Sequence, residues 1–316
     1  MNDRIVTEQM IKFIRDTFTY LLFEKRLNLL RTSAPLIIEC DNGVNDDLAG
    51  QSAAVSFPII NHGLNVEIVQ SLAKWKRIKL KTLQMSPREG IYTNMNAIRA
   101  NETLDKLHSA YVDQWDWEMV IDEIDRTPIF LFEFVDIIYI SLREKEKLFC
   151  EKFNTKPFLK PYLSFVSYDT LKARYPGKSQ KEIEYLETQS QKSVFIYALD
   201  KNCDRASDYD DWSLNGDLII WSDAINAPIE ISSMGIRVDK NALEYQLEEC
   251  DENWKKKFDY HKMILSGELP PTIGGGIGQS RLCMLLMQRK HIGEVQSSVW
   301  DDNNIQYAEA NNLTLL

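Results

Sequence analysis

The segment TIGGGIGQSR, residues 272–281, runs directly into the apolar stretch LCMLLMQ and carries four glycines in five positions, 274 to 278. Glycines permit tight backbone conformations and the close approach of a ligand, while Arg281 marks the start of what reads as a buried helix. The segment lacks the GK[ST] ending of a P-loop and the GxGxxG spacing of a dinucleotide-binding fold. It indicates either an anion-binding site or a plain turn between a strand and a helix.

Periodic patterns predict the elements around this segment. Apolar residues that recur every three or four positions predict helices at 7–31, 72–80, 121–153, 168–175 and 241–265. Short β-branched or aromatic runs predict strands at 35–39, 66–71, 90–98, 109–117, 193–199, 216–221 and 228–239. The polar, acidic stretch 202–216 is expected to be a loop. Because strands and helices do not alternate strictly, we predict an α+β fold with a mainly antiparallel sheet flanked by helices, in one domain of residues 1–316.

Composition limits the class of protein. The chain has 316 residues, of which 44% are hydrophobic, so it can bury a large core. Its 37 Lys and Arg against 47 Asp and Glu give a net charge of −10, which disfavours nucleic acids and anionic lipid surfaces but permits a small nucleotide held by local arginines. Five cysteines without a CxxC pair fit a reducing compartment. Since no signal peptide or spanning segment is evident, we expect a cytoplasmic location without membrane association.

A second polar pattern lies upstream. Arg99 ends one predicted strand, and the aromatic, acidic strand YVDQWDWE (111–118) begins about a dozen residues later, as in a hairpin. Alternation along this strand places Asp113, Trp115 and Trp117 on one face, and Val112, Gln114, Asp116 and Glu118 on the other. The polar face indicates either a functional surface or an ordinary solvated strand edge.

These segments together resemble a known family. The strand–loop–strand unit with Arg99, the strand IEISSMGIR and the segment GGGIGQSRLCMLL resemble motifs 2 and 3 of class II aminoacyl-tRNA synthetase catalytic domains, in their aspartate-specific branch. A more specific resemblance, over essentially the whole chain, is to the ammonia-dependent asparagine synthetase (aspartate–ammonia ligase) family. It is carried by QSLAKWKR (70–77), EGIYTNMNAIR (89–99), YVDQWDWE (111–118), DYDDWSLNGD (208–217), ISSMGIRVD (231–239) and TIGGGIGQSRL (272–282).

The resemblance implies an ATP-dependent ligase that converts L-aspartate and ammonia to L-asparagine through a β-aspartyl-adenylate, releasing AMP and pyrophosphate. It also implies a homodimer, with the N-terminal helix and the adjacent strand near the partner. Adenylation turns a carboxylate oxygen into a good leaving group, and cations neutralise the charge that develops on phosphate. Mg²⁺ is implied by the family, and no spacing in the sequence reveals it.

The resemblance also assigns residues. Arg99 and Arg281 match the ATP-binding arginines, Gly276 lies in the ATP-binding segment, and Asp217 and Glu230 match acidic positions suited to Mg²⁺. The positions associated with aspartate and ammonia are Asp46, Ser71, Lys76, Gln114, Asp116, Asp210 and Ser233. In the roles we expect, Lys76 pairs with a substrate carboxylate, and Asp116 or Asp210 receives the α-ammonium. Asp46 and Gln114 then orient ammonia or the new amide, and Asp46 also serves as a candidate base.

Each assignment has an ordinary structural alternative. Lys76 and Arg77 could form a solvated helix face, Asp46 and Asp47 a helix N-cap, and 208–211 a turn-rich acidic loop. A relative of aspartyl- or asparaginyl-tRNA synthetases that needs tRNA is disfavoured, because no basic anticodon-binding module is evident. A glutamine-dependent enzyme would need an N-terminal nucleophilic cysteine, whereas residue 2 is Asn2. A catalytically silent nucleotide binder is disfavoured because both arginines are present.

Overall fold

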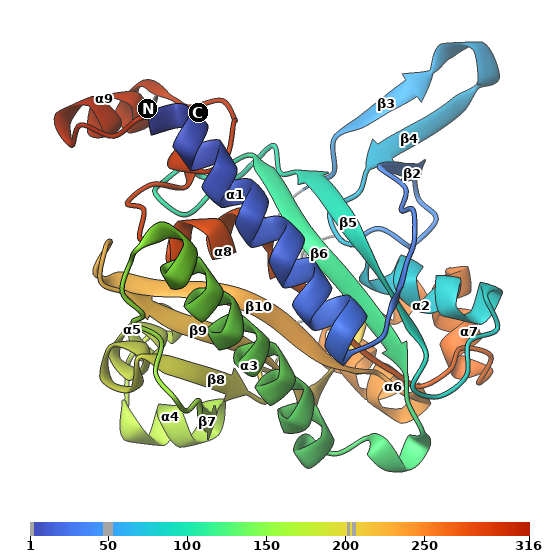
Figure 1. Ribbon diagram of the computed structural model, residues 1–316. Coiled ribbons are helices and arrows are strands. Elements are labelled where there is room, and N and C mark those ends of the chain that lie inside the picture. Colours follow the sequence, from blue (N-terminus) through green and yellow to red (C-terminus); the bar gives the residue numbers. More distant parts are fainter. Residues whose placement is uncertain (1–2, 47–52, 201–202, 204–206) are drawn as a thin grey trace.

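The structure, a computed structural model, describes residues 3–46, 53–200, 203 and 207–316, and a large mixed sheet forms its centre (Figure 1). In spatial order the strands are β1 (Leu30–Arg31), β5 (Gly90–Ile98), β6 (Tyr111–Val120), β11 (Thr272–Gly278), β10 (Ala227–Arg237), β9 (Asp210–Ser222), β8 (Ser193–Tyr197) and β7 (Ser164–Ser167). Neighbouring strands are antiparallel except for the outer pairs β1–β5 and β7–β8. The mainly antiparallel sheet is confirmed, and the parallel pairs at both edges were not predicted.

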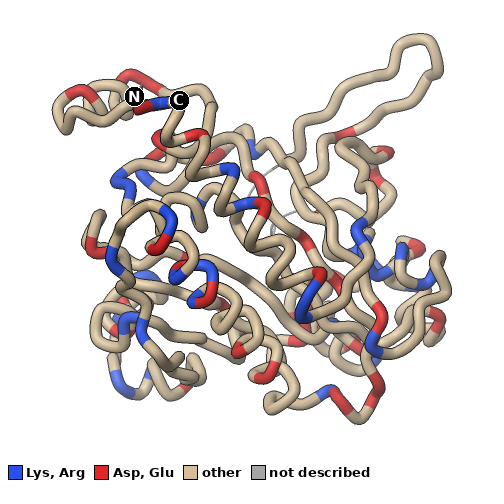
Figure 2. Tube along the Cα trace, in the orientation of Figure 1, with Lys and Arg blue, Asp and Glu red and all other residues tan. Residues whose placement is uncertain are grey.

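A small second sheet projects from the body of the molecule. It has the order β2 (Ile37–Glu39), β4 (Leu64–Ile68) and β3 (Ser56–Ile59), and a 3₁₀ turn at Ile60–His62 connects β3 to β4. Figure 1 shows β3 and β4 as a protruding hairpin, and Figure 2 shows no charged residue near its tip. The sequence predicted strands at 35–39 and 66–71, but not β3.

Helices cover both faces of the large sheet. On one face lie α1 (Asp3–Thr19), its π-helical continuation (Tyr20–Arg26), α3 (Pro128–Phe153) and α8 (Gln279–Leu286), as Figure 1 shows for α1 and α3. On the opposite face α2 (Ala73–Thr82) packs against β5, β6 and β11. The remaining helices are α4 (Tyr168–Arg174), α5 (Gln180–Gln191), α6 (Lys240–Glu249), α7 (Asp259–Leu265) and α9 (Asp302–Ala310), with 3₁₀ turns at Glu123–Asp125, Asn253–Lys257 and Ile292–Glu294.

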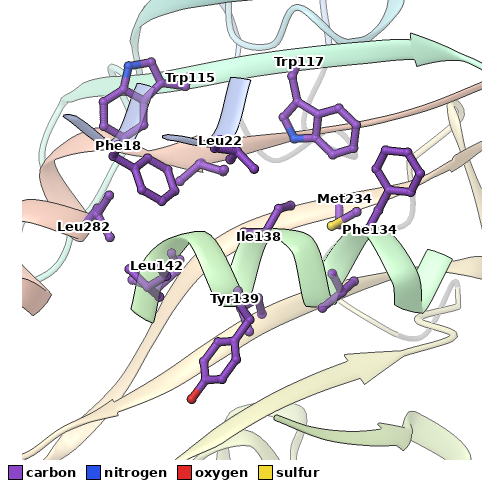
Figure 3. Packing of buried hydrophobic residues seen from close by; sticks show 14 of the residues in the cluster. Phe18, Leu22, Trp115, Trp117, Phe134, Ile138, Tyr139, Leu142, Met234 and Leu282 are labelled. Carbon is purple, nitrogen blue, oxygen red and sulfur yellow. The ribbon is translucent and has the colours of Figure 1, made fainter. Parts of the chain in front are cut away.

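The main hydrophobic core lies between the sheet and the helices of the first face (Figure 3). Trp115 and Trp117 of β6 point into it, and Trp117 stacks on Phe134 of α3 with ring centroids 5.8 Å apart. Because alternate residues of a strand point to opposite faces, Gln114, Asp116 and Glu118 face α2 instead. The alternation predicted for 111–118 is confirmed, and β6 lies inside the sheet, so its polar face is not a solvated edge.

Several predicted boundaries were wrong. The helix expected at 121–153 begins at Pro128, since Thr127 caps it and proline suits the first helical position. The helix expected at 241–265 is two helices, because Asp251 has a φ of +56° and a 3₁₀ turn follows it. The helix expected to reach residue 31 becomes π-helical at Tyr20 and ends at Arg26. Neither α5 nor α9 was predicted.

The acidic stretch 202–216 is not a loop throughout, because β9 begins at Asp210. Its polar residues fit into a buried strand because they have partners. The Gln246 side chain accepts from the backbone N–H of Trp212 and donates to the Asp210 carbonyl. Part of this stretch, at 202 and 204–206, lies outside the described residues, as does the Asp47 of the alternative N-cap. Among the described residues no helix is long and apolar enough to span a membrane.

Candidate active site

The glycine-rich segment is a central strand, not a turn. None of its glycines has a positive φ, so backbone freedom does not explain them. Gly274, Gly276 and Gly278 lie on one face of β11, the face toward α2 and the polar residues of β6. A Cβ at Gly276 would sit 2.6 Å from Gln114 Oε1, and a Cβ at Gly274 would overlap the Glu118 carboxylate. The glycines leave space for the polar side chains of β6.

A cavity of about 390 Å³ opens above this glycine floor, between β6, β10, β11, α2 and the segment before β9. It gathers most of the residues that the sequence singled out from distant parts of the chain. Those that line it are Asp46, Ser71, Lys76, Arg99, Gln114, Asp116, Asp210, Glu230, Ser233, Gly276 and Arg281. Asp217 is the one predicted site residue that does not line the cavity.

Lys76 and Asp116 form a buried pair on the cavity wall. Lys76 Nζ donates to Asp116 Oδ1 at 2.5 Å and to the carbonyl oxygens of Trp117 and Gly275, each at 3.1 Å. Neither Lys76 nor Arg77 forms a solvated helix face, because both are buried and Arg77 donates to two backbone carbonyls. Asp116 Oδ2 is also buried, and within the described part of the chain no hydrogen-bond donor reaches it. This oxygen can accept from a ligand.

Beneath this pair, Arg237 of β10 joins two acids from different strands. Its Nε donates to Glu118 Oε1 at 2.9 Å, its Nη2 donates to Glu118 Oε2 at 2.7 Å, and its Nη1 donates to Asp210 Oδ1. Burial alone would raise the pKa of Glu118, but Arg237 and Lys76 outweigh burial and lower it. The two acids likewise overcome burial and raise the pKa of Arg237 well above its usual range. Glu118 and Arg237 are therefore both charged at neutral pH.

The three successive residues Asp208, Tyr209 and Asp210 bind side chains from other parts of the fold next to the cavity. The Asp208 carboxylate is buried and accepts from Lys74 Nζ at 2.8 Å and from His261 Nε2 at 2.9 Å if that ring nitrogen is protonated. Tyr209 donates its hydroxyl to Asp46 Oδ2 at 3.1 Å. Asp210 meets Arg237. This segment is a buried junction rather than a solvated acidic turn, and it holds Asp46 in the cavity wall.

Two arginines with loose ion pairs mark the other end of the cavity. Arg99 Nη1 lies 3.8 Å from Glu102 Oε2, and Arg281 Nη1 lies 3.6 Å from Glu230 Oε2. These distances exceed those of direct hydrogen bonds. Both arginine side chains are about a quarter exposed, 27% and 24%. Their guanidinium groups can therefore turn toward an anionic ligand at little cost.

Asp217 and Glu230, the predicted metal ligands, differ in their surroundings. The Ser233 hydroxyl donates to Asp217 Oδ1 at 2.6 Å on the neighbouring strand, while Glu230 lies at the cavity edge beside Arg281. The described residues contain no group of three or more His, Cys, Asp or Glu side chains able to hold a metal ion by themselves. Glu230 can at most add one carboxylate to an ion that phosphate oxygens also bind.

Sequence reasoning missed several cavity residues that alternation could have found. Ser233, Gly235 and Arg237 share one face of β10, so the predicted site residue Ser233 already pointed to Arg237. Glu118, which binds Arg237 without lining the cavity, follows Gln114 and Asp116 on the polar face of β6. Tyr209 carried no comparable signal, because its role depends on the path of an irregular segment.

Comparison with known proteins identifies the family to which the chain belongs. The family model for aspartate–ammonia ligases (AsnA) matches residues 5–312. This chain belongs to the aspartate–ammonia ligase family. The aspartate–ammonia ligase of Mycoplasmoides gallisepticum is 47% identical over 98% of each chain, and that of Limosilactobacillus reuteri is 45% identical over 98% of this chain and 95% of its own. As a member of the family, the chain is a ligase.

Solved structures identify the fold. Entamoeba histolytica asparaginyl-tRNA synthetase superimposes with a TM-score of 0.70 at 13% identity, covering 94% of this chain and 67% of its own. Pyrococcus horikoshii asparaginyl-tRNA synthetase, complexed with asparaginyl-adenylate, superimposes with a TM-score of 0.65 at 15% identity, covering 92% and 67%. The predicted likeness to class II aminoacyl-tRNA synthetases is confirmed at the level of the fold.

Proposed function

We propose that this ligase makes L-asparagine from L-aspartate, ammonia and ATP through a β-aspartyl-adenylate, releasing AMP and pyrophosphate. The observation that carries the proposal is the division of one cavity into a cationic end, with Arg99 and Arg281, and an acidic end, with Asp46, Asp116 and Asp210. Such a division suits a nucleotide beside an amino acid. The P. horikoshii relative of this fold holds an asparaginyl-adenylate, which supports adenylate chemistry here.

At the cationic end, Arg99 and Arg281 would bind the phosphates and neutralise the charge that develops as pyrophosphate leaves. Gly276 would let the nucleotide lie close to the backbone of β11. Mg²⁺ arriving with ATP would share the neutralisation of phosphate charge, and Glu230, which lies beside Arg281 at the cavity edge, would supply a carboxylate to it. Asp217 would act behind Ser233 rather than at the cavity surface.

At the acidic end, Asp116 Oδ2 is the strongest candidate for receiving the α-ammonium of aspartate, because it is buried and open to a donor. Asp210 is the weaker candidate, since its Oδ1 already binds Arg237. Lys76 keeps its proposed pairing with a substrate carboxylate, which requires it to release one of its three acceptors. Ser71 and Ser233 supply hydroxyl groups to the same wall.

Ammonia would enter on the side of Asp46 and Gln114 and attack the activated β-carboxyl carbon. Asp46 is the proposed base that takes a proton from ammonium, with its orientation held by Tyr209.

We propose that residues 1–316 form one catalytic domain that works in the cytoplasm, on free aspartate and ammonia, without a nucleic-acid partner. We also propose a homodimer in which α1 and the next predicted strand along the chain, β2, lie near the partner.

The direct test is to incubate the purified protein with Mg²⁺-ATP, aspartate and ammonium and to measure asparagine, AMP and pyrophosphate. All three products should form in equal amounts without tRNA. Arg99→Ala and Arg281→Ala should each reduce turnover by more than about a hundredfold and remain folded. Arg143→Ala is the control and should retain full activity, because the Arg143 guanidinium donates to the Pro161 carbonyl and does not line the cavity. ADP as the product, or a requirement for tRNA, would contradict the proposal.

A further inference from the structure

The first turn of α8 is held by an acid from a neighbouring strand. α8 follows β11 without a loop, and its N-cap is Gly278, which has no side chain to accept the first N–H groups. Asp113 of β6 fills this role. Its Oδ1 accepts from the backbone N–H of Ser280 at 3.1 Å, and its Oδ2 accepts from the Ser280 hydroxyl at 2.8 Å.

Several donors balance the charge of the buried Asp113. Arg15 Nη2 of α1 donates to Asp113 Oδ2 at 2.7 Å, and Gln296 Nε2 donates to Oδ1 at 3.3 Å. Burial alone would lower the pKa of Arg15, but Asp113 and Cys283 outweigh burial and raise it. The positive end of the α8 dipole also faces the carboxylate. Asp113 thus joins α1, β6 and α8 through charge-assisted hydrogen bonds.

Arg281 is the next residue after Ser280, and its contacts to Glu230 are long. Its guanidinium lies 3.4 Å from the Glu230 carbonyl and 3.6 Å from the Glu230 carboxylate. The stem of Arg281 lies against Gly278, where a Cβ would come within 3.3 Å of Arg281 Cβ. The direction of Arg281 therefore depends on the backbone of the first turn of α8, which Asp113 holds.

We propose that Asp113 is a positioning residue that directs Arg281 toward the nucleotide. The inference rests on the proposed function for the identity of that nucleotide as ATP. Asp113 and Ser280 both line the cavity, and Asp113 acts on Arg281 through its two hydrogen bonds to Ser280 in the first turn of α8. We therefore expect the charge of Asp113 to affect the affinity for ATP more than the affinity for aspartate.

The decisive variant is Asp113→Asn, which keeps the size of the side chain and one acceptor. It loses the charge and sets an amide NH₂ or an uncharged oxygen against Arg15 and the Ser280 hydroxyl. We expect KM and Kd for ATP to rise about tenfold or more, while KM for aspartate changes less than about twofold. Ser280→Ala removes the hydrogen bond from the Ser280 hydroxyl to Asp113 and keeps the one from the backbone N–H. It should therefore also raise KM and Kd for ATP, but by less than Asp113→Asn does.

Glu146→Gln is the matched control, because Glu146 is a buried acid that accepts the backbone N–H groups of Phe158 and Leu159 at 2.7 and 2.9 Å. It should lower stability and leave KM for ATP unchanged. Equal rises in both KM values for folded Asp113→Asn, or unaltered ATP binding, overturn the inference. If Asp113→Asn does not fold, Ser280→Ala decides by the same comparison.

Calorimetric binding of ATP to the wild-type protein separates this inference from the proposed function. Failure of the wild type to bind ATP or to form asparagine counts against the proposed function. If the wild type turns over normally and Asp113→Asn binds ATP normally, the proposed role of Asp113 is wrong while the proposed function stands.

Discussion

Single residues on β11 determine the shape of the cavity floor. The glycine run looked like a flexible turn in the sequence, because glycine is commonest where the backbone needs a positive φ. The glycines instead leave room for the side chains of Gln114 and Glu118, which a Cβ at these positions would obstruct. Sequence reasoning identified the segment and Arg281, but a tight backbone conformation was the wrong reason for the glycines, because none of them has a positive φ. The close approach of β6 side chains could not be predicted, since it is a property of strand pairing between distant segments.

Gly276→Ala tests this role. The new Cβ would stand 2.6 Å from Gln114 Oε1, so the amide must move, and we expect asparagine formation to fall by about tenfold or more while the chain still folds. Steady-state kinetics and thermal unfolding measure the two effects. In the Gln114→Ala background the same substitution should cost much less stability, because the obstructing amide is gone. An equal stability loss in both backgrounds would rule out the steric explanation.

At the scale of elements, charged side chains connect strands that are distant in sequence. Arg237 links β10 to Glu118 of β6 and Asp210 of β9, with all three buried. The sequence predicted β10, β6 with its polar face, and β9 only from residue 216, so it placed Asp210 in a loop. It did not predict the order of these strands in the sheet. Strand order depends on long-range pairing that local periodicity does not encode.

Arg237→Met should destabilise the protein by about 3–5 kcal/mol, because it leaves Glu118 and Asp210 as buried charges without their counterion. Urea unfolding measures the loss. The combination of Arg237→Met with Glu118→Gln should be less damaging than the sum of the single changes, since the second removes one uncompensated charge. Strictly additive losses would show that the two side chains do not interact.

Lys145 couples α3 to α1 and gives a pH-dependent stability. It is buried, donates to the Phe13 carbonyl at 2.7 Å, and burial lowers its pKa to about 7. Between pH 7 and 10 the unfolded chain holds a proton that the folded chain lacks, so the unfolding free energy rises with pH through this residue. The unfolding free energy of Lys145→Met minus that of wild type should therefore be largest near pH 7 and should fall as the pH rises toward 10, because only the wild type gains stability over this range.

Denaturant unfolding at several pH values measures this trend. Lys147→Met on the same helix is the control, because Lys147 is 77% exposed and should give a difference that does not vary with pH over this range. A pH-independent difference for Lys145→Met would mean that its ammonium stays charged throughout.

At the scale of the whole molecule, the projecting hairpin β3–β4 is the exposed apolar feature that a partner subunit could cover. Its tip carries no charge, and Ile60 is 86% exposed. If the proposed homodimer covers this tip, Ile60→Asp should shift sedimentation toward the monomer. Ile124→Asp changes a residue of nearly equal exposure, 85%, outside the hairpin and should leave the sedimentation coefficient unchanged. A monomeric wild type, or equal effects of both changes, would contradict the proposal.

Whole-molecule predictions from the sequence succeeded where separate motifs agreed. The α+β class and the mainly antiparallel sheet followed from the irregular order of strands and helices, and the family followed from six segments in a fixed order. The predicted site residues other than Asp217 line one cavity. The small β3 strand, α9 and the Asp113 junction were missed. Only the Asp113 junction depends on contacts between segments far apart in the chain, for which periodicity gives no signal. β3 pairs locally with β4, and α9 is a short helix capped by Asp301.

The place of β11 in the sheet has a consequence for synthesis on the ribosome. β11 is made late, at Thr272–Gly278, yet it lies between β6 and β10 in the middle of the sheet. A nascent chain that has not reached residue 272 therefore has two half-sheets, each with an unpaired strand edge where the centre will be. Such edges readily pair with other chains. Translational pausing just before residue 272 should make the chain depend on chaperones. A product truncated before residue 272 should lack the floor of the active-site cavity.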